Sequence, residues 1–237
     1  MTMTRRAVLA LMPGPALFAG SAQAQSPVVA DLQLVLAVDT SGSVNQERFE
    51  LQRRGYADAF RNPKVLRAML GGQSRGCAIA MMQWTGPELQ VDVVPWVLVD
   101  SERAAAALAD SIDASQRRLY GGGTSISGAI DYAVTMFPRS PYTSERRIID
   151  ISGDGSNNRG RPVTEARDQA VAAGLRINGL PILSLEPNLD EYYKTSVIGG
   201  PGAFMIPAAT YNVFADAIVQ KLILEISDMA GCPALPT

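Results

Sequence analysis

The chain has 237 residues, is 47% hydrophobic, carries a formal net charge of −2 and contains no histidine. This length and apolar content are enough to bury one sizeable core. The absence of histidine excludes Ser-His-Asp and Cys-His catalysis and histidine-ligated zinc. The mildly acidic balance argues against a protein that binds nucleic acid or an anionic membrane surface.

The first residues have the organisation of a secretory signal. Arg5 and Arg6 precede a short apolar stretch, and Ala22 and Ala24 supply an A-x-A cleavage site. We therefore expect residues 1–24 to be a signal peptide and the bacterial protein to be periplasmic or secreted. "TRRAVLA" also resembles a twin-arginine signal, although Val8 stands where phenylalanine is usual. The apolar stretch is too short for a membrane span, and cleavage would change the formal charge from −2 to −4.

The remaining chain alternates strand-like and helix-like segments. Apolar runs with β-branched residues predict buried strands, and apolar side chains at helical spacing predict helices. Strands are expected at 31–39, 76–84, 89–99, 146–155, 175–185 and 203–208. Helices are expected at 45–60, 101–114, 126–137, from about 162, at 189–198 and at 210–229, with a short turn over 64–70. This order predicts one α/β domain over 28–230, with a mostly parallel sheet, helices on both faces and a tail at 231–237.

Several single residues refine these expectations. Pro95 suits an edge strand over 89–99, because proline cannot donate to a central ladder. Asn45, Ser101 and Thr210 are expected as helix N-caps, and Pro162 as a first helical residue. Cys77 and Cys232 are the only cysteines. Whether they form a disulfide stays open, because sequence does not give their separation.

Polar clusters follow the buried segments. Asp39, Ser41 and Ser43 follow the first strand, Thr124 follows a glycine loop, and Asp154 follows "IIDISG". In open α/β sheets, ligands bind outside the carboxyl ends of the strands, where these side chains would meet. Two carboxylates and three hydroxyls form an oxygen-only donor set, which suits Mg²⁺, with Mn²⁺ or Ca²⁺ as alternatives. Such a site would remain electrophilic and would accept one more anionic oxygen.

The combination of "DTSGS", the threonine of "GGGTSISGAI" and the aspartate of "ISGDG" resembles the metal-ion-dependent adhesion site of von Willebrand factor A domains. The resemblance extends over essentially the whole mature chain and implies a Rossmann-like sheet with one antiparallel edge strand. The chain also looks like a bacterial family of secreted, uncharacterised A-domain proteins that carry the "SGDG" form.

The resemblance implies a role for each matched residue. Ser41, Ser43 and Thr124 would be direct or near-direct ligands of the cation, and Asp39 and Asp154 would coordinate it directly or through water. A carboxylate from a protein partner would fill the open position. In related domains the last helix can move when the ligand binds, and whether the helix over 210–229 does so here stays open. The usual apolar-Thr-Asp-Gly ending is here "ISGDGSNN", so residues 152–158 would reshape the rim of the site. Oligomeric state is not predicted.

Two alternatives stay open. One is a Mg²⁺-dependent phosphatase of the haloacid dehalogenase type with Asp39 as nucleophile. Against it, Ser41 stands where that family needs a second aspartate, and no lysine lies between Lys64 and Lys194. The other is a structural domain with a vestigial site. The leading interpretation is a binding module that is not an enzyme.

Other polar and aromatic residues are interpreted more simply. Asp150 would make a structural hydrogen bond, since a mid-strand carboxylate is costly to bury alone. The alternative is that it tunes the ligands of the metal site from behind. Trp84 and Trp96 would pack in the core. The arginine pairs at 53–54, 117–118 and 146–147 would be solvated, and the loop residues 157–159 would contact a partner.

Overall fold

The computed structural model describes residues 27–71 and 76–227. Within these residues, a five-stranded sheet has the order β4-β3-β2-β6-β7. All neighbouring strands are parallel except β3 and β4, which are antiparallel. The strands are β2 (Leu32–Asp39), β3 (Cys77–Trp84), β4 (Gln90–Val99), β6 (Arg147–Gly153) and β7 (Arg176–Pro181). A separate parallel pair joins β1 (Val28–Val29) to β5 (Tyr142–Thr143).

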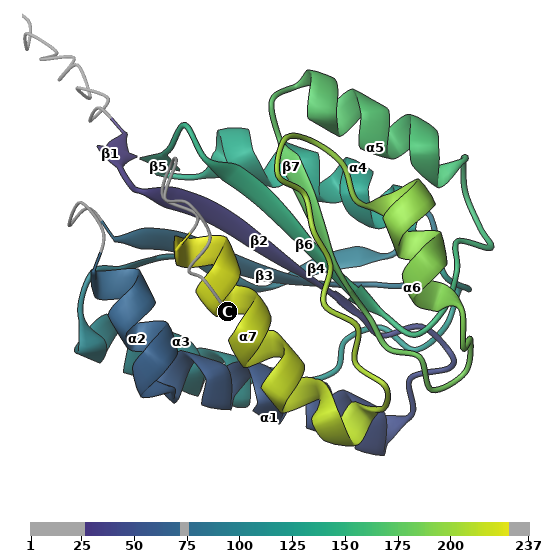
Figure 1. Ribbon diagram of the computed structural model, residues 1–237, viewed down its shortest axis with the longest axis horizontal. Coiled ribbons are helices and arrows are strands. Elements are labelled where there is room, and N and C mark those ends of the chain that lie inside the picture. Colours follow the sequence, from purple (N-terminus) through teal and green to yellow (C-terminus); the bar gives the residue numbers. More distant parts are fainter. Residues whose placement is uncertain (1–26, 72–75, 228–237) are drawn as a thin grey trace, which may run out of the picture.

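Helices cover both faces of the sheet (Figure 1). One layer contains α1 (Gln46–Arg61), α2 (Pro63–Leu70), α3 (Glu102–Asp113) and α7 (Phe214–Ser227). The other contains α4 (Ile126–Met136), α5 (Val163–Ala172) and α6 (Leu189–Tyr192), which continues as a π-helical segment (Tyr193–Val197). Strand β2 is buried on both sides because its side chains alternate: Leu34 and Leu36 pack under the first layer, and Val35 and Ala37 under the second.

The predicted α/β fold with an antiparallel edge strand is confirmed. Pro95 lies where the register between β3 and β4 shifts, between Ile79 and Met81. A proline is tolerated at such a bulge because the missing N–H leaves no ladder bond broken. Trp84 is fully buried as expected, and the half-buried Trp96 donates from its indole to Met136 O at 3.2 Å.

Several predicted boundaries were wrong. The segment expected as a turn over 64–70 is the helix α2, because Asn62 caps it and Pro63 occupies its first turn. The expected strand over 203–208 makes only isolated bridges at Met205 and Ala208. Pro162 is the residue before the first turn of α5. Thr210 makes no capping hydrogen bond, and the chain enters α7 through a short 3-10 turn, Tyr211–Val213.

Two sequence predictions lie outside the described residues. These are the signal peptide over 1–24 and the tail over 231–237, which includes Cys232. The open question of a disulfide to the buried Cys77 falls there as well. None of the helices in the described part of the chain is both long and apolar enough to cross a membrane.

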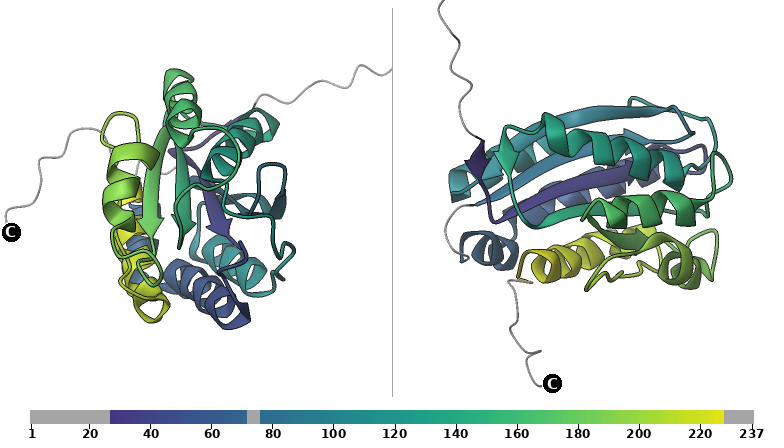
Figure 2. Two further views of the ribbon diagram at one scale, coloured as in Figure 1. Left: turned by 90° about the vertical axis from the view of Figure 1, so that its right-hand side faces the viewer. Right: turned by 90° about the horizontal axis from the view of Figure 1, so that it is seen from above.

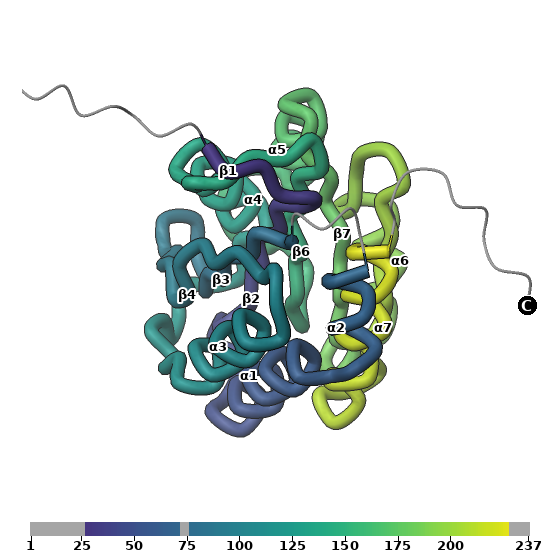
Figure 3. The backbone as a smooth tube through the Cα atoms, turned by 90° about the vertical axis from the view of Figure 1, so that its left-hand side faces the viewer, coloured from purple at the N-terminus to yellow at the C-terminus, as the bar shows by residue number. Residues whose placement is uncertain are grey.

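The parallel strands all end at one edge of the sheet, which faces the viewer in the left panel of Figure 2. Their register brings Asp39 of β2 level with Trp84 of β3, and Gly153 of β6 level with Pro181 of β7. The opposite edge, with β1 and α2, faces the viewer in Figure 3. The loops that follow β2, β3, β6 and β7 therefore converge on the first edge.

Candidate functional site

The turn after β2 is organised by its own polar side chains. Ser41 N donates to Asp39 Oδ1 at 2.7 Å, which folds the chain back toward the carboxylate. The hydroxyls of Ser41 and Ser43 lie 3.1 Å apart. Asp39 is fully buried, and its Oδ2 has no hydrogen-bond partner among the described residues. The turn thus presents two hydroxyls and one unsatisfied carboxylate oxygen.

Asp154 joins this turn from the end of β6. Ser43 Oγ donates to Asp154 Oδ1 at 2.5 Å, so residues far apart in sequence meet at the sheet edge. The other oxygen, Oδ2, accepts from the Tyr211 hydroxyl at 2.8 Å and lies 3.4 Å from Nη1 of Arg48. Arg48 Nη1 also donates to Ser43 O at 2.7 Å. Every oxygen of the Asp154 carboxylate therefore has a partner.

Thr124 lies beside the loop that follows Asp154. Gly122 and Gly123 precede it with φ of 104° and 86°, a conformation that glycine adopts without strain. Asn158 closes the contact, because its Oδ1 accepts from Thr124 N at 2.9 Å and its N donates to Thr124 O at 2.9 Å. A Cβ built on Gly155 would lie 3.7 Å from Thr124 Oγ1. Thr124 does not cap α4, since Ser125 Oγ accepts from Gly128 N at 3.1 Å.

The structure thus brings Asp39, Ser41, Ser43 and Asp154 into one hydrogen-bonded cluster and places Thr124 at the adjoining loop. Burial, together with the negative charge of Asp154, raises the pKa of Asp39 to about 7. Burial likewise raises the pKa of Tyr193 and of Tyr211, and Asp154 adds to both effects. The surroundings of Asp39 therefore disfavour its ionised form.

These residues fit a hard divalent cation. Their donors are all oxygens, and a cation would supply the partner that Asp39 Oδ2 lacks. The described residues contain no group of three or more His, Cys, Asp or Glu side chains placed for a metal. The present cluster has only two carboxylates, and hydroxyls complete its donor set. That composition is consistent with a cation that keeps water and accepts one further anionic ligand.

Sequence reasoning missed several residues that shape the site. Arg48 and Tyr211 hold Asp154, and nothing in the local sequence indicates that they approach it. Arg117, expected in solvent, donates from Nη2 to Thr40 O at 2.9 Å and to Ser41 O at 3.1 Å. Glu186 accepts from Ser156 N at 3.0 Å, which adds a carboxylate at the rim.

The structure shows what three residues of the segment over 152–158 contact within the chain. Ser152 does not reshape the rim, because it is fully buried and accepts a hydrogen bond from Tyr56 at 3.2 Å. Asn157 and Asn158 make hydrogen bonds within the chain: Asn157 Oδ1 accepts from Ser127 N at 3.0 Å, and Asn158 Oδ1 accepts from Thr124 N at 2.9 Å. Their contact with a partner stays a prediction. Arg159 remains exposed beside the glycine loop.

A fully buried ion cluster lies under α7. Lys221 Nζ is 2.7 Å from Asp150 Oδ1 and also contacts Glu225. The contact between Lys221 and Asp150 is an ion pair, and neither carboxylate oxygen of Asp150 has a hydrogen-bond partner among the described residues. Asn178 Nδ2 donates to Glu225 Oε1 at 2.9 Å. Asp150 therefore has a buried structural partner, a lysine of the last helix, but the contact is an ion pair and not the hydrogen bond that was expected.

The other arginine pairs expected in solvent are also anchored. Arg53 bonds Glu50 and Asp113, while Arg146 donates to Glu225 O at 2.6 Å and Arg147 to Ala173 O at 2.8 Å. Arg54 remains largely exposed, as expected.

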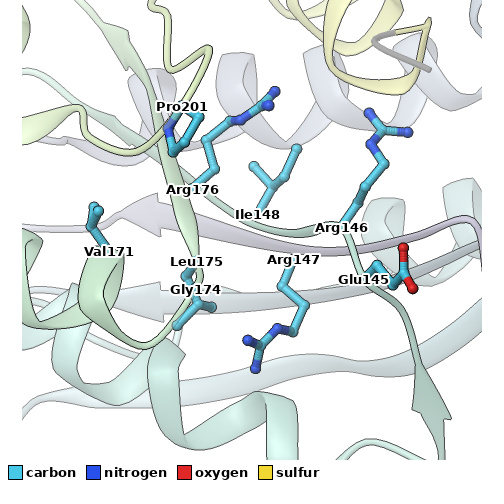
Figure 4. Close-up of a pocket in the computed structure, with 9 residues that line it drawn as sticks. All are labelled: Glu145, Arg146, Arg147, Ile148, Val171, Gly174, Leu175, Arg176 and Pro201. Carbon is cyan, nitrogen blue, oxygen red and sulfur yellow. The ribbon is translucent and has the colours of Figure 1, made fainter. Parts of the chain in front are cut away.

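A cavity of about 340 Å³ lies at the opposite edge of the sheet and contains three arginines (Figure 4). The side chains of Arg146 and Arg176 lie on one side of the strands and Arg147 on the other. Because their guanidinium groups do not converge, this cavity does not form a common anion site.

The fold is similar to that of von Willebrand factor A domains, as predicted. The chain belongs to the family described as "Protein of unknown function (DUF1194)", whose model matches residues 29–230. No protein with a curated description matches the chain.

Three solved structures illustrate the fold. Proximal thread matrix protein 1 of the mussel byssus, solved with a zinc-occupied MIDAS motif, is 12% identical over 85% of this chain and 49% of its own, with a TM-score of 0.60. A von Willebrand factor type A protein from Catenulispora acidiphila is 16% identical over 83% of this chain and 43% of its own, with a TM-score of 0.59. The pilus adhesin SpaC of Lactobacillus rhamnosus GG is 13% identical over 84% of this chain and 31% of its own, with a TM-score of 0.58. This chain spans less than half the length of each.

Proposed function

We propose that this protein is an exported binding module that holds a divalent cation, Mg²⁺ in the first instance, and uses it to bind an acidic residue of a protein partner. Asp39, Ser41, Ser43, Thr124 and Asp154 would hold the cation. A bound Mg²⁺ would supply an electrophilic position that a carboxylate oxygen of the partner can occupy. The chain would carry out no reaction.

One observation carries this proposal: Asp39 Oδ2 is buried without a partner beside two hydroxyls and a second carboxylate. Leaving a buried carboxylate oxygen unsatisfied costs about 1–3 kcal/mol or more. A cation would remove that cost. Arg48 compensates Asp154 at 3.4 Å, whereas none of the described residues forms an ion pair with Asp39.

The similar structures support a binding role at the level of the fold. The mussel protein is described with a zinc-occupied MIDAS motif, and SpaC is described as a pilus adhesin. Both share less than 25% identity with this chain, so the metal and the partner are proposals for this protein.

Thermal unfolding with MgCl₂ and with EDTA tests the cation. A ligand at 100 times its dissociation constant stabilises the native state by about 2.7 kcal/mol. We expect MgCl₂ to raise the midpoint of the wild type and to leave that of Asp39→Asn unchanged. Asp58→Asn is the matched control, because the Asp58 side chain is 73% exposed and remote from the cluster. Equal midpoints in MgCl₂ and EDTA for the wild type would contradict the proposal and favour a vestigial site.

A generic phosphomonoester assay with Mg²⁺ tests the phosphatase alternative. The residue that would have to act as general acid is Ser41, whose hydroxyl lies 3.1 Å from Ser43 Oγ. Because a serine does not supply that proton readily, we expect no turnover. Turnover that is lost in Asp39→Asn would replace the binding proposal.

A further inference from the structure

A second buried oxygen without a hydrogen-bond partner lies beside Asp39. Tyr193 is fully buried, and its hydroxyl makes no hydrogen bond with the described residues. Asp39 Oδ2 is in the same condition. A Cβ built on Gly153 would lie 3.0 Å from Asp39 Oδ2 and 3.1 Å from the Tyr193 hydroxyl, so both oxygens surround one point at the end of β6. The two unpartnered atoms are therefore neighbours.

Two glycines leave the space that the Tyr193 side chain occupies. A Cβ on Gly179 of β7 would lie 2.5 Å from Cδ1 of Tyr193, so a larger residue there would displace the ring. Gly153 of β6 leaves room for the hydroxyl in the same way. Tyr193 also begins the π-helical segment, in which Ile198 N donates to Tyr193 O at 2.9 Å. Single π-helical turns are rare and frequently occur at functional sites.

Tyrosine at position 193 carries a cost that phenylalanine would avoid. Phenylalanine would fill the same space without burying a polar atom, and a buried hydroxyl that has no partner lowers stability. Tyr56 shows the ordinary arrangement of a buried tyrosine, because its hydroxyl donates to Ser152 Oγ at 3.2 Å. The hydroxyl at 193 therefore indicates a ligand that is not part of the chain.

A water bound to a divalent cation has the chemistry to satisfy both oxygens. The oxygen of such a water faces the cation, so its two protons need acceptors. A carboxylate oxygen and a phenol oxygen both accept hydrogen bonds. Mg²⁺ gives up its waters reluctantly and usually keeps several of them in a protein site. Asp39 Oδ2 and the Tyr193 hydroxyl together offer the two acceptors that one retained water requires.

We propose that Tyr193 is a positioning residue of the cation site, and that its hydroxyl and Asp39 Oδ2 together bind one water of the cation's shell. Asp39 then coordinates the cation through that water. This inference rests on the proposed function of the same site, and it adds a residue that lies outside the five candidate ligands. It also gives the buried, unpartnered hydroxyl of Tyr193 a role that phenylalanine could not perform.

Tyr193→Phe tests this role with two measurements on the full chain. Calorimetric titration with MgCl₂ measures the affinity for the cation, and we expect it to fall about tenfold, as is typical when a group behind a metal ligand is lost. Urea unfolding in EDTA measures the stability of the metal-free protein. We expect that stability to be unchanged or higher, because the substitution removes a buried hydroxyl that has no partner.

Tyr56→Phe is the matched control, because Tyr56 is also fully buried but its hydroxyl has a partner. That partner, Ser152, is not one of the candidate ligands. We expect the opposite pattern for this variant: lower stability in EDTA, since a buried hydrogen bond is lost, and the wild-type affinity for Mg²⁺. A purely structural role of Tyr193 would give Tyr193→Phe the same pattern as Tyr56→Phe.

The outcomes separate this inference from the proposed function. Weaker Mg²⁺ binding by Tyr193→Phe, with undiminished stability in EDTA, would support the positioning role. Equal Mg²⁺ affinity in Tyr193→Phe and the wild type would overturn that role and leave the cation site standing. A loss of stability in EDTA would overturn it as well, because the hydroxyl would then have a partner within the chain. Absence of Mg²⁺ binding by the wild type would overturn the proposed function and this inference together.

Discussion

Tyr211 donates a hydrogen bond from its hydroxyl to Asp154 Oδ2 at 2.8 Å, and this bond joins the turn before α7 to the end of β6. The same helix is tied to the sheet further along by Lys221, which pairs with Asp150. Asp150 lies within β6, and Asp154 is the first residue after it. The last helix therefore contacts both the candidate site and the buried ion cluster.

Replacing Tyr211 with phenylalanine should weaken cation binding. The hydroxyl orients the Asp154 carboxylate, and loss of a group that orients a metal ligand typically costs about 10–100-fold in affinity. Calorimetric titration with MgCl₂ measures the change, and we expect about a tenfold loss in Tyr211→Phe. Tyr132→Phe is the control, because Tyr132 lies on α4, away from Asp154. An unchanged affinity in Tyr211→Phe would mean that Ser43 and Arg48 alone orient Asp154.

Gly153→Ala should destabilise the site, and Gly42→Ala should not. A Cβ on Gly153 would lie 3.0 Å from Asp39 Oδ2 and 3.1 Å from the Tyr193 hydroxyl, so both neighbours would have to move. Overpacking of this kind costs about 1–3 kcal/mol. A Cβ on Gly42 would have nothing within 4 Å. Urea unfolding in EDTA compares the two variants, and equal loss of stability in both would contradict this account.

Lys221→Met should destabilise the protein strongly. The substitution leaves the buried carboxylates of Asp150 and Glu225 without their cation, and breaking a buried pair costs about 3–5 kcal/mol. Lys194→Met is the control, since the Lys194 side chain is 65% exposed and pairs only loosely with Glu191. That surface change should cost less than about 0.5 kcal/mol. Denaturant unfolding at neutral pH measures the free energy of unfolding of Lys221→Met and of Lys194→Met and so compares the two variants.

Stability should fall as pH rises toward neutrality, in part through Asp150. Burial raises the pKa of Asp150 from 3.8 to about 7, with Glu225 acting in the same direction and Lys221 opposing. The folded state therefore keeps a proton that the unfolded chain releases above about pH 4. The contribution of Asp150 to the free energy of unfolding is fully present at low pH and is lost as pH rises through about 7. The free energy of unfolding falls by up to about 1.4 kcal/mol per pH unit in this range.

Asp150→Asn isolates this effect, because asparagine does not titrate. Tyr56, Tyr193, Lys221 and Glu225 also face Asp150, and they remain in both proteins. Asp39, whose pKa is raised in the same direction, also contributes equally to both. We expect the wild type to lose more stability than Asp150→Asn between pH 5 and pH 7, measured by urea unfolding. Identical slopes would show that Asp150 binds no extra proton on folding.

The sequence alone predicted the α/β order of the elements because its cues are local. The largely apolar run of β2 and the capped helices α1 and α3 can each be recognised from a few consecutive residues. The predicted boundaries of elements were wrong where contacts with other parts of the fold determine where an element begins or ends. The segment over 203–208 has strand-like residues but pairs with β7 only at isolated positions. Thr210 has the chemistry of a cap, yet the chain turns through Tyr211 instead.

The candidate ligands were also predictable, because Asp39, Ser41 and Ser43 are close in sequence and parallel strands end at a common edge. What surrounds them was decided by the tertiary structure alone. Arg48 and Tyr211 reach Asp154 from other elements, and Arg117 was expected in solvent but donates to Thr40 O. Such contacts depend on the packing of helices and loops against the sheet. The physical reason is that residue type and spacing determine which oxygens a strand presents at its end, whereas only packing determines which side chains from elsewhere come to hold them.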